Sequence, residues 1–457
     1  MSEDRSDQLH VLIERLRAVD PMDIVRRYDA EFDIPLDNSV ATGVLRLQDA
    51  FEPHAIVVDP ADDNSAGLPT VRFVGAHWCG MVAHDVNYRL AEGLQLVQAS
   101  QGAAAALLAA WNRRPDDVTG DAAYVLCRWF DGAGKLRYRL GAHARARRSF
   151  QTAVHVAEQA RLWWALPDLR SNLRRGEFEE LRQAVAQGPR FRERRDDLLT
   201  ALTGLAADCV EEAAARGIPL DRPDAGPTGH DHRQVEFLRG YSSVLHNLAV
   251  TLKESGSPAA SLEVSRRASG ISERLGDRYR EAQAVNHQAA LAQARDDRGT
   301  ARAHYDRVLL LGWNRGALIA RQNLATLQDE PQAVLQDLRR LADDLASAAG
   351  GERSTDIDIR WYTVNKMADT VHRLRLGGRD AVREVDDRKL GLARLVRPVV
   401  AIPSYKQEYA NQIRPTFLAV AGRALARGRP DDALAHVEES SARDLLDMMS
   451  STTLPTL

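Results

Sequence analysis

The chain has 457 residues, of which 44% are hydrophobic and 27% are charged, with a formal net charge of −3. This balance is that of a folded protein and excludes an intrinsically disordered chain, while the length suits a repeat solenoid, which grows without thickening its core. The charge gives no overall basic surface for nucleic acid, and no segment approaches 18 uninterrupted apolar residues. The first ten residues lack the basic and apolar pattern of a signal peptide. We therefore expect a cytoplasmic protein with neither membrane nor nucleic acid as a partner.

Two further features of the composition concern disulfide bonding and the kind of genome that encodes the protein. The three cysteines, Cys79, Cys127 and Cys209, lie far apart without metal-ligand spacing, so we expect no disulfide framework. Almost all basic residues are arginine and alanine is abundant, which is typical of a GC-rich bacterial genome.

Residues 1–100 differ in pattern from the rest of the chain. Apolar residues at helical spacing predict a helix around residues 9–16, and runs rich in β-branched residues at 56–58 and 71–74 predict two short strands. Because the exposed end of a solenoid has to be covered, we expect residues 1–100 to form a small α+β N-terminal cap.

Beyond this cap, a pattern of small and large apolar residues recurs about every 35 to 40 residues, as in stacked helical hairpins. The two clearest copies place it at Leu248, Ala249, Gly256, Leu262 and Ala268, and at Ala289, Ala292, Ala301, Tyr305 and Val308. Small residues let two antiparallel helices approach closely, and the large ones fill the seam with the next hairpin. The predicted fold class is therefore all-α, a helical-hairpin solenoid with the α+β cap at its N-terminus.

The same pattern divides the chain. Helical repeats are predicted over 101–216 and 235–349, separated by a loop or linker at 217–234 that is rich in proline and other turn formers. After a second break at 350–356, residues 357–457 are expected to hold imperfect hairpins and a terminal helix.

These spacings resemble tetratricopeptide repeats. The end of the chain resembles a particular linking helix that occurs in some proteins with such repeats. In bacterial proteins that fuse such an array to a CHAT caspase-like protease, a helix with an acidic residue, Ser-Arg-Ala-Arg and a Leu-Leu pair joins the two parts. The residues that match this helix in kind are Glu438, Glu439, Ser441, Ala442, Arg443, Leu445 and Leu446. We expect no protease domain after them, so the resemblance implies a sensor or regulatory partner rather than the protease activity.

The concave groove of the array is the first candidate binding site. Counting from the small position of each repeat, the polar residues expected to face the groove or its edge are His246, Asn247, Lys253, Asn286, His287, Gln293, Gln322 and Asn323. Polar side chains there satisfy the hydrogen-bonding groups of an extended peptide in place of water. The carboxylate clamp of some family members is incomplete, because Lys253 is the only lysine in these repeats. The equally weighted alternative is a solvated polar face or capping within a repeat.

The terminal helix, residues 431–449, is the second candidate. Leu445, Leu446 and Met449 give it apolar residues beyond the single face that a terminal helix can bury. We expect it to dock an effector or a second copy of the chain, the alternative being that the tail after it folds back over it.

Signals for chemistry are weak. His77, Cys79 and His84 contain a thiol and imidazoles, but a buried packing role is the more common reading. The triplet at 230–232, His-Asp-His, has no distant partners for a metal site, and no nucleotide-binding or hydrolase motif is present. We expect no catalytic residue, metal or cofactor.

The sequence thus predicts a non-enzymatic protein- or peptide-binding scaffold, the regulatory or sensor partner of a separate effector such as a CHAT-type protease. Two alternatives stay open: a receptor for a peptide or small-molecule signal, and an enzyme with an N-terminal Cys/His site.

Overall fold

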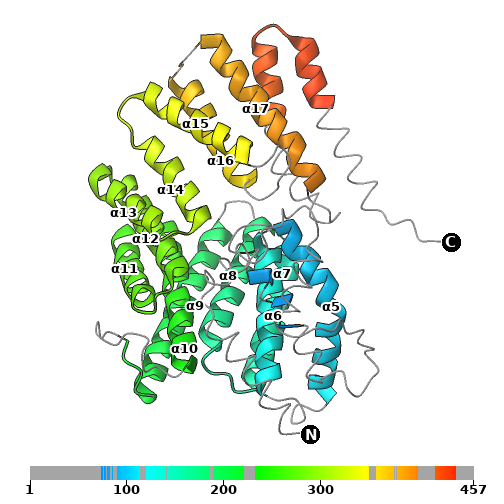
Figure 1. The fold of residues 1–457 in the computed structure, drawn as a ribbon, viewed down its shortest axis with the longest axis vertical. Coiled ribbons are helices and arrows are strands. Elements are labelled where there is room, and N and C mark those ends of the chain that lie inside the picture. Colours follow the sequence, from blue (N-terminus) through cyan, green and yellow to red (C-terminus); the bar gives the residue numbers. More distant parts are fainter. Residues whose placement is uncertain are drawn as a thin grey trace, which may run out of the picture. The chain divides into compact units, whose positions relative to one another are not determined.

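The structure, a computed structural model, describes residues 74–75, 77–78, 80–82, 85, 90–113, 120–139, 142–184, 189–220, 232–348, 357–374, 376, 378–399 and 417–438. Its named helices follow each other in chain order (Figure 1). They are α5 (Leu90–Arg113), α6 (Gly120–Arg139), α7 (His143–Gln159), α8 (Leu166–Ala184), α9 (Pro189–Ala215), α10 (His232–Glu254), α11 (Pro258–Arg274), α12 (Arg278–Ala294), α13 (Arg298–Leu310), α14 (Asn314–Thr326), α15 (Pro331–Ala348), α16 (Ile357–Leu374) and α17 (Gly378–Val399). Two further helical segments span 417–426 and 430–438.

Consecutive helices pair as hairpins and stack on the next pair. Helix α6 packs on α7, α8 on α9, α10 on α11 and α12 on α13, while α6, α8, α10 and α12 also contact one another in succession. This second set of contacts defines an inner layer of helices, with α7, α9, α11 and α13 as the outer layer. The described residues have the predicted all-α helical-hairpin fold, and no strand occurs among them.

Sharp turns between the helices explain the regular stacking. Gly256 and Gly276 end α10 and α11 with φ of 79° and 65°, a left-handed conformation that glycine adopts without steric cost. Asp296 takes the same role after α12 with φ of 58°. Asp277 and Asp297 then cap α12 and α13, each accepting a hydrogen bond from a backbone N–H three residues on.

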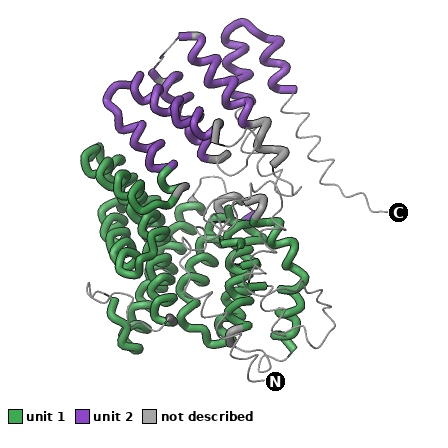
Figure 2. The backbone as a smooth tube through the Cα atoms, viewed as in Figure 1, with its two compact units in different colours: residues 1–139, 143–317 green, residues 140–142, 318–457 purple. Residues whose placement is uncertain are grey.

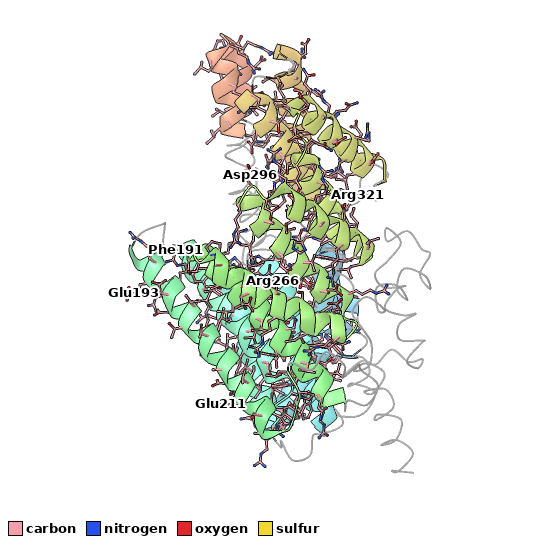
Figure 3. All side chains as sticks on the ribbon, turned by 90° about the vertical axis from the view of Figure 1, so that its left-hand side faces the viewer. Phe191, Glu193, Glu211, Arg266, Asp296 and Arg321 are labelled. Atoms are coloured by element: carbon pink, nitrogen blue, oxygen red, sulfur yellow. The ribbon has the colours of Figure 1, made fainter. Side chains whose placement is uncertain are left out.

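The predicted small positions lie between packed helices. Ala249, Ala268, Ala289 and Ala301 are all completely buried, as are the large residues of the second copy, Tyr305 and Val308. The predicted register of these repeats is therefore confirmed. Charged side chains project from the outer layer instead: Glu193 and Glu211 on α9 and Arg266 on α11 are exposed (Figure 3).

The chain forms two compact units (Figure 2). Unit 1 comprises residues 1–139 and 143–317, and unit 2 comprises residues 140–142 and 318–457. Unit 2 has its own apolar core, in which Leu338, Met367, Val371 and Val385 are fully buried. The proline-rich segment 217–234 does not divide the units: α9 and α10, on either side of it, pack together inside unit 1, and α10 already begins at His232.

The expected N-terminal cap lies mostly outside the described residues. Val74, at the end of the second predicted strand, is helical, so the strand does not extend to this residue; helix α5 also begins at Leu90, within the range assigned to the cap. The predicted helix around residues 9–16 and the strand at 56–58 belong to the part that is not described. No helix of the described part combines the length and apolar character that crossing a membrane requires.

Candidate functional site

A cavity of about 350 Å³ opens within unit 1 against the inner layer of helices. One face of each of α6, α8, α10 and α12 contributes side chains spaced three or four residues apart, which is the spacing of a single helix face. The polar and charged lining residues are Asp85, Tyr124, Arg128, Asp131, Lys135, Tyr138, Arg139, Asp168, Asn172, Arg175, Glu236, Arg239, Ser242, Ser243, His246, Asn247, Tyr279, Arg280 and Gln283, with Trp78, Val82, Gly132, Phe150 and Val250 between them.

Small residues bring the walls of this cavity together. Gly240 of α10 lies against the start of α8, where a Cβ atom would come within 3.0 Å of the backbone nitrogen of Asp168. Gly134 leaves room for the ring of Phe150, which a Cβ would approach to 2.5 Å. Because α8 and α10 pack this closely, acidic residues at the start of each helix meet the basic residues of α6.

Arg128 is the centre of the buried charge cluster. Its Nη1 lies 3.0 Å from a carboxylate oxygen of Asp168, its Nη2 contacts Glu236, and its Nε donates to the hydroxyl of Tyr124 at 3.3 Å. The Tyr124 hydroxyl in turn donates to Glu236 at 3.3 Å. One guanidinium thus joins three inner helices, because its five N–H donors form a rigid fork.

Lys135 lies about two turns further along α6 and pairs with two carboxylates. Its Nζ is 2.8 Å from Asp131 and 3.3 Å from Asp168, and Asn172 donates to the other oxygen of Asp131 at 2.9 Å. Burial favours the neutral acid, but Lys135 and the nearby arginines outweigh it and lower the pKa of Asp168 well below its usual value. For Asp131, burial prevails and, with the neighbouring Asp168, raises the pKa.

The cluster continues onto α12. Arg239 lies 3.2 Å from Glu236 and 3.6 Å from Asp277, and Asp277 pairs with Arg280 at 2.7 Å. Arg280 also donates from Nε to the hydroxyl of Ser243 at 3.1 Å. Although burial acts to raise the pKa of Glu236, Arg128, Arg239 and Arg280 together lower it to about 2. The carboxylate therefore stays ionised and paired at neutral pH.

Neutral hydrogen-bonding groups line the rest of the cavity. Gln283 donates to the Tyr279 hydroxyl at 2.8 Å, and Arg139 reaches the same hydroxyl at 3.4 Å while pairing with Asp85 at 2.7 Å. Asn247 donates to the Ser171 hydroxyl at 2.8 Å. These contacts fix the orientation of the lining and leave its amide and hydroxyl groups at the cavity wall.

Among the predicted groove residues, His246 and Asn247 line the cavity. The Nδ1 of His246 is buried without a hydrogen-bond partner in the described part of the chain. Burial, reinforced by the charge of Arg175, lowers the pKa of His246 to about 4, so the ring is neutral at physiological pH. The rings of His246 and His287 are arranged edge to face, with the ring centroids 6.1 Å apart.

The other predicted groove residues lie elsewhere. His287 is buried and its Nε2 is 2.9 Å from the Ser261 hydroxyl, so it joins the two layers of helices. Gln293 accepts from the Tyr305 hydroxyl at 2.9 Å, and Lys253 is exposed. The Oδ1 of Asn286 is buried and unpartnered among the described residues. None of these four is among the lining residues of the cavity.

Gln322 and Asn323 belong to unit 2. Gln322 is buried and donates to the Thr363 hydroxyl at 3.3 Å, and Asn323 accepts from Lys366 at 2.6 Å. Both connect α14 to α16. The predicted docking residues Leu445, Leu446 and Met449 lie outside the described residues.

The structure gives little support to the two weaker candidate chemical sites, the Cys/His segment 77–84 and the triplet 230–232. His77 is buried, and Cys79 and His84 fall outside the described part. Within that part no three His, Cys, Asp or Glu side chains gather in a way that could hold a metal ion, and of the 230–232 triplet only His232 is described.

Comparison with known proteins finds similarity to solved structures but none to a protein family or a curated protein. No protein-family model matches the chain, and no curated protein matches it. Among solved structures, the Rap protein in complex with competence and sporulation factor aligns with a TM-score of 0.46 and 9% identity, over 98% of this chain and 99% of that chain. The Cut9–Hcn1 heterotetramer of APC/C gives 0.22 and 12%, over 94% and 97%, and yeast Tom70 gives 0.20 and 10%, over 90% and 95%. At scores this low, the fold assignment depends on the packing of this chain's own helices.

Proposed function

We propose that the protein is a non-enzymatic binding scaffold that takes a short, extended peptide segment of a partner into the cavity of unit 1. The observation that carries this proposal is the lining of that cavity, which the inner helices of consecutive hairpins supply from one face each. A row of inner helices gives a ligand a series of side chains at regular spacing, which suits an extended chain.

The size of the cavity supports a short segment rather than a folded domain. Ligand sites range from about 300 to about 1,000 Å³, and 350 Å³ lies at the lower end. An extended peptide brings unpaired backbone N–H and C=O groups, which have to be satisfied when they leave water. Asn247, Gln283 and Ser243 provide amide and hydroxyl groups for this, and the apolar side chains of Val250 and Phe150 provide surface for peptide side chains.

Blocking the cavity tests the proposal. Val250→Trp places a large ring among the lining residues, whereas Ala260→Trp adds the same ring at an exposed position of the outer helix α11. Peptides selected from a displayed random hexapeptide library on the wild-type protein should lose binding to Val250→Trp and keep it with Ala260→Trp, as measured by fluorescence polarisation. Equal binding to both folded variants, or no selected peptide at all, contradicts a peptide site in this cavity.

The same cavity supports a receptor for a small-molecule signal as a second candidate, because 350 Å³ also holds a small ligand. Thermal shift of the purified protein with a metabolite collection distinguishes the two. The small-molecule receptor is favoured if a metabolite raises the melting temperature of the wild-type protein but not that of Val250→Trp, and if no peptide binds.

A regulatory role beside a separate effector, such as a CHAT-type protease in the cytoplasm of a bacterium, is the finer form of the proposal. It depends on the terminal segment 431–449, of which the described part has Leu434 and Val437 exposed, at 57% and 38%. Such apolar exposure on a helix suits docking to another chain. Deletion of residues 440–457 should abolish capture of that effector in a pull-down from the native host, and its retention rejects the docking role.

A further inference from the structure

We infer that the ligand of the unit 1 cavity is an acidic peptide segment, whose carboxylates meet basic side chains of α6, α8 and α12. This inference rests on the proposed function and adds the chemistry of the ligand. It follows from which partner of each ion pair faces the cavity.

In most of the ion pairs around the cavity the cation is the more exposed member; the exceptions are the pairs of Glu236 with Arg128 and Arg239, which are nearly equal, and the pair of Arg175 with Glu254. The Lys135 side chain is 31% exposed against 3% for Asp131, and Arg280 is 16% exposed against 0% for Asp277. The pairs of Arg139 with Asp85 and of Arg175 with Glu179 have the same asymmetry, at 22% against 9% and 15% against 4%. In these four pairs the carboxylate is the more buried partner, so a ligand there meets N–H donors first.

The basic groups also retain donors that their carboxylates do not use. Lys135 has three N–H donors and two carboxylate partners. Arg280 uses Nη1 for Asp277 and Nε for Ser243, which leaves Nη2 without a partner in the described part of the chain. The Nη1 of Arg175 is buried and has no hydrogen-bond partner among the described residues. A buried donor without a partner costs free energy that a ligand carboxylate would recover.

The balance of charge favours a few carboxylates over a polyanion. Six basic and four acidic side chains line the cavity, and the whole chain carries −3. A nucleic acid needs a continuous basic surface that neutralises many phosphates. Asp277 and Glu179 offset two of these cations from behind the lining, so the site offers a few exposed basic groups rather than a large positive charge. Those basic groups, placed between Trp78, Phe150 and Val250, fit instead a peptide that alternates acidic and apolar side chains.

The probes are two pools of acetylated, amidated hexapeptides, one with Asp and Glu at alternate positions and one with Asn and Gln in their place. Both pools have the same shape and differ in charge. We expect the acidic pool to bind the wild-type protein about tenfold more tightly or better, by fluorescence polarisation, and the difference to shrink as salt is added. Equal binding of the two pools overturns the inference while leaving the proposed function intact.

A charge change at Gln283 tests the location. Gln283→Glu adds a carboxylate to the lining and Gln283→Lys adds a cation, while Gln151→Glu adds a carboxylate at an exposed position of α7. Binding of the acidic pool should weaken about tenfold in Gln283→Glu, and should be kept or strengthened in Gln283→Lys and unchanged in Gln151→Glu. Thermal melting establishes that each variant is folded.

The remaining outcomes separate the two proposals. If Gln283→Glu and Gln283→Lys bind the acidic pool equally, the anion does not lie in this cavity and the inference fails. If neither pool binds but adenosine monophosphate or a short oligonucleotide does, and Val250→Trp abolishes that binding, both the acidic peptide and the peptide scaffold are wrong.

Discussion

Arg128 shows how much of the candidate site depends on a single residue. It is buried and contacts Asp168, Glu236 and Tyr124, which come from three helices. Burial acts to lower the pKa of its guanidinium, but these neighbours raise it above the usual value. A buried carboxylate is tolerated only while its partner is present, because an unpaired charge in a poorly solvated site is costly.

Arg128→Met should therefore destabilise the protein by about 3–5 kcal/mol, since it leaves Asp168 and Glu236 without their shared partner. Urea unfolding followed by circular dichroism measures this change. Arg170→Met is the matched control: its pair with Glu158 is exposed, and its loss should cost less than about 1 kcal/mol. Equal destabilisation by the two substitutions would show that the cluster is not buried as described.

His246 predicts a specific pH dependence of stability. Burial, with the charge of Arg175 in addition, lowers its pKa from 6.5 to about 4 in the folded protein. Between these values the unfolded chain binds a proton that the folded chain does not, so stability is complete above pH 6.5 and falls as the pH drops toward 4. His246→Gln should remove part of this loss, measured as the midpoint of urea unfolding at pH 7 and pH 5. His155→Gln, at an exposed position of α7, is the matched control; if it has the same effect as His246→Gln, burial of His246 is not the cause.

Whether a residue of the site could be predicted from the sequence depends on how far along the chain its partners lie. Helical spacing from Ala249 places His246 on the inner face, and the structure brings it and Asn247 to the cavity. Arg128 pairs with Asp168 and Glu236 across 40 and 108 residues, and each taken alone has the pattern of ordinary surface charge on a helix. No periodicity along the chain reveals such a pairing. The one local signal is the apolar surroundings of Arg128, in a segment whose neighbours Tyr124, Leu126 and Trp129 are almost fully buried.

At the scale of elements, the small positions of the sequence were sufficient to predict the hairpins. An alanine or glycine at a helix crossing decides how closely two axes approach, and this property is local to the residue. The segment 217–234 shows the limit of local signals, because proline and glycine indicate an irregular backbone and not whether the flanking helices separate. Here α9 and α10 pack together across it through Leu202, Leu248 and their neighbours.

Ala289→Leu tests this packing. Ala289 is fully buried on α12, and the added side chain should overpack the crossing by about 1–3 kcal/mol. Ala294→Leu, at an exposed position of the same helix, makes the same chemical change without a crossing and should alter stability by less than about 0.5 kcal/mol. Differential scanning calorimetry compares the two. Wild-type melting of Ala289→Leu would mean that the repeat register is incorrect.

At the scale of the whole molecule, the division into two compact units separates the proposed binding function from much of the chain. All residues that line the cavity belong to unit 1, whereas Gln322 and Asn323, which were expected to share in the same groove, belong to unit 2. Each unit has its own buried core, so each can unfold as a cooperative unit of its own. The sequence pattern alone does not place this boundary, because it falls between residues 317 and 318 inside the continuous helix α14.

Val385→Asp should unfold unit 2 and leave peptide binding in place. Val385 is fully buried in the core of unit 2, where an unpaired carboxylate costs several kcal/mol. The full-length variant should lose one calorimetric transition and keep its affinity for the selected peptide within about twofold, because unit 1 stays folded. The reciprocal change, Val244→Asp in the core of unit 1, should abolish binding while the transition of unit 2 persists. If Val385→Asp abolishes binding although the transition of unit 1 is intact, the ligand needs residues of unit 2, and Gln322 and Asn323 return as candidates for contacting it.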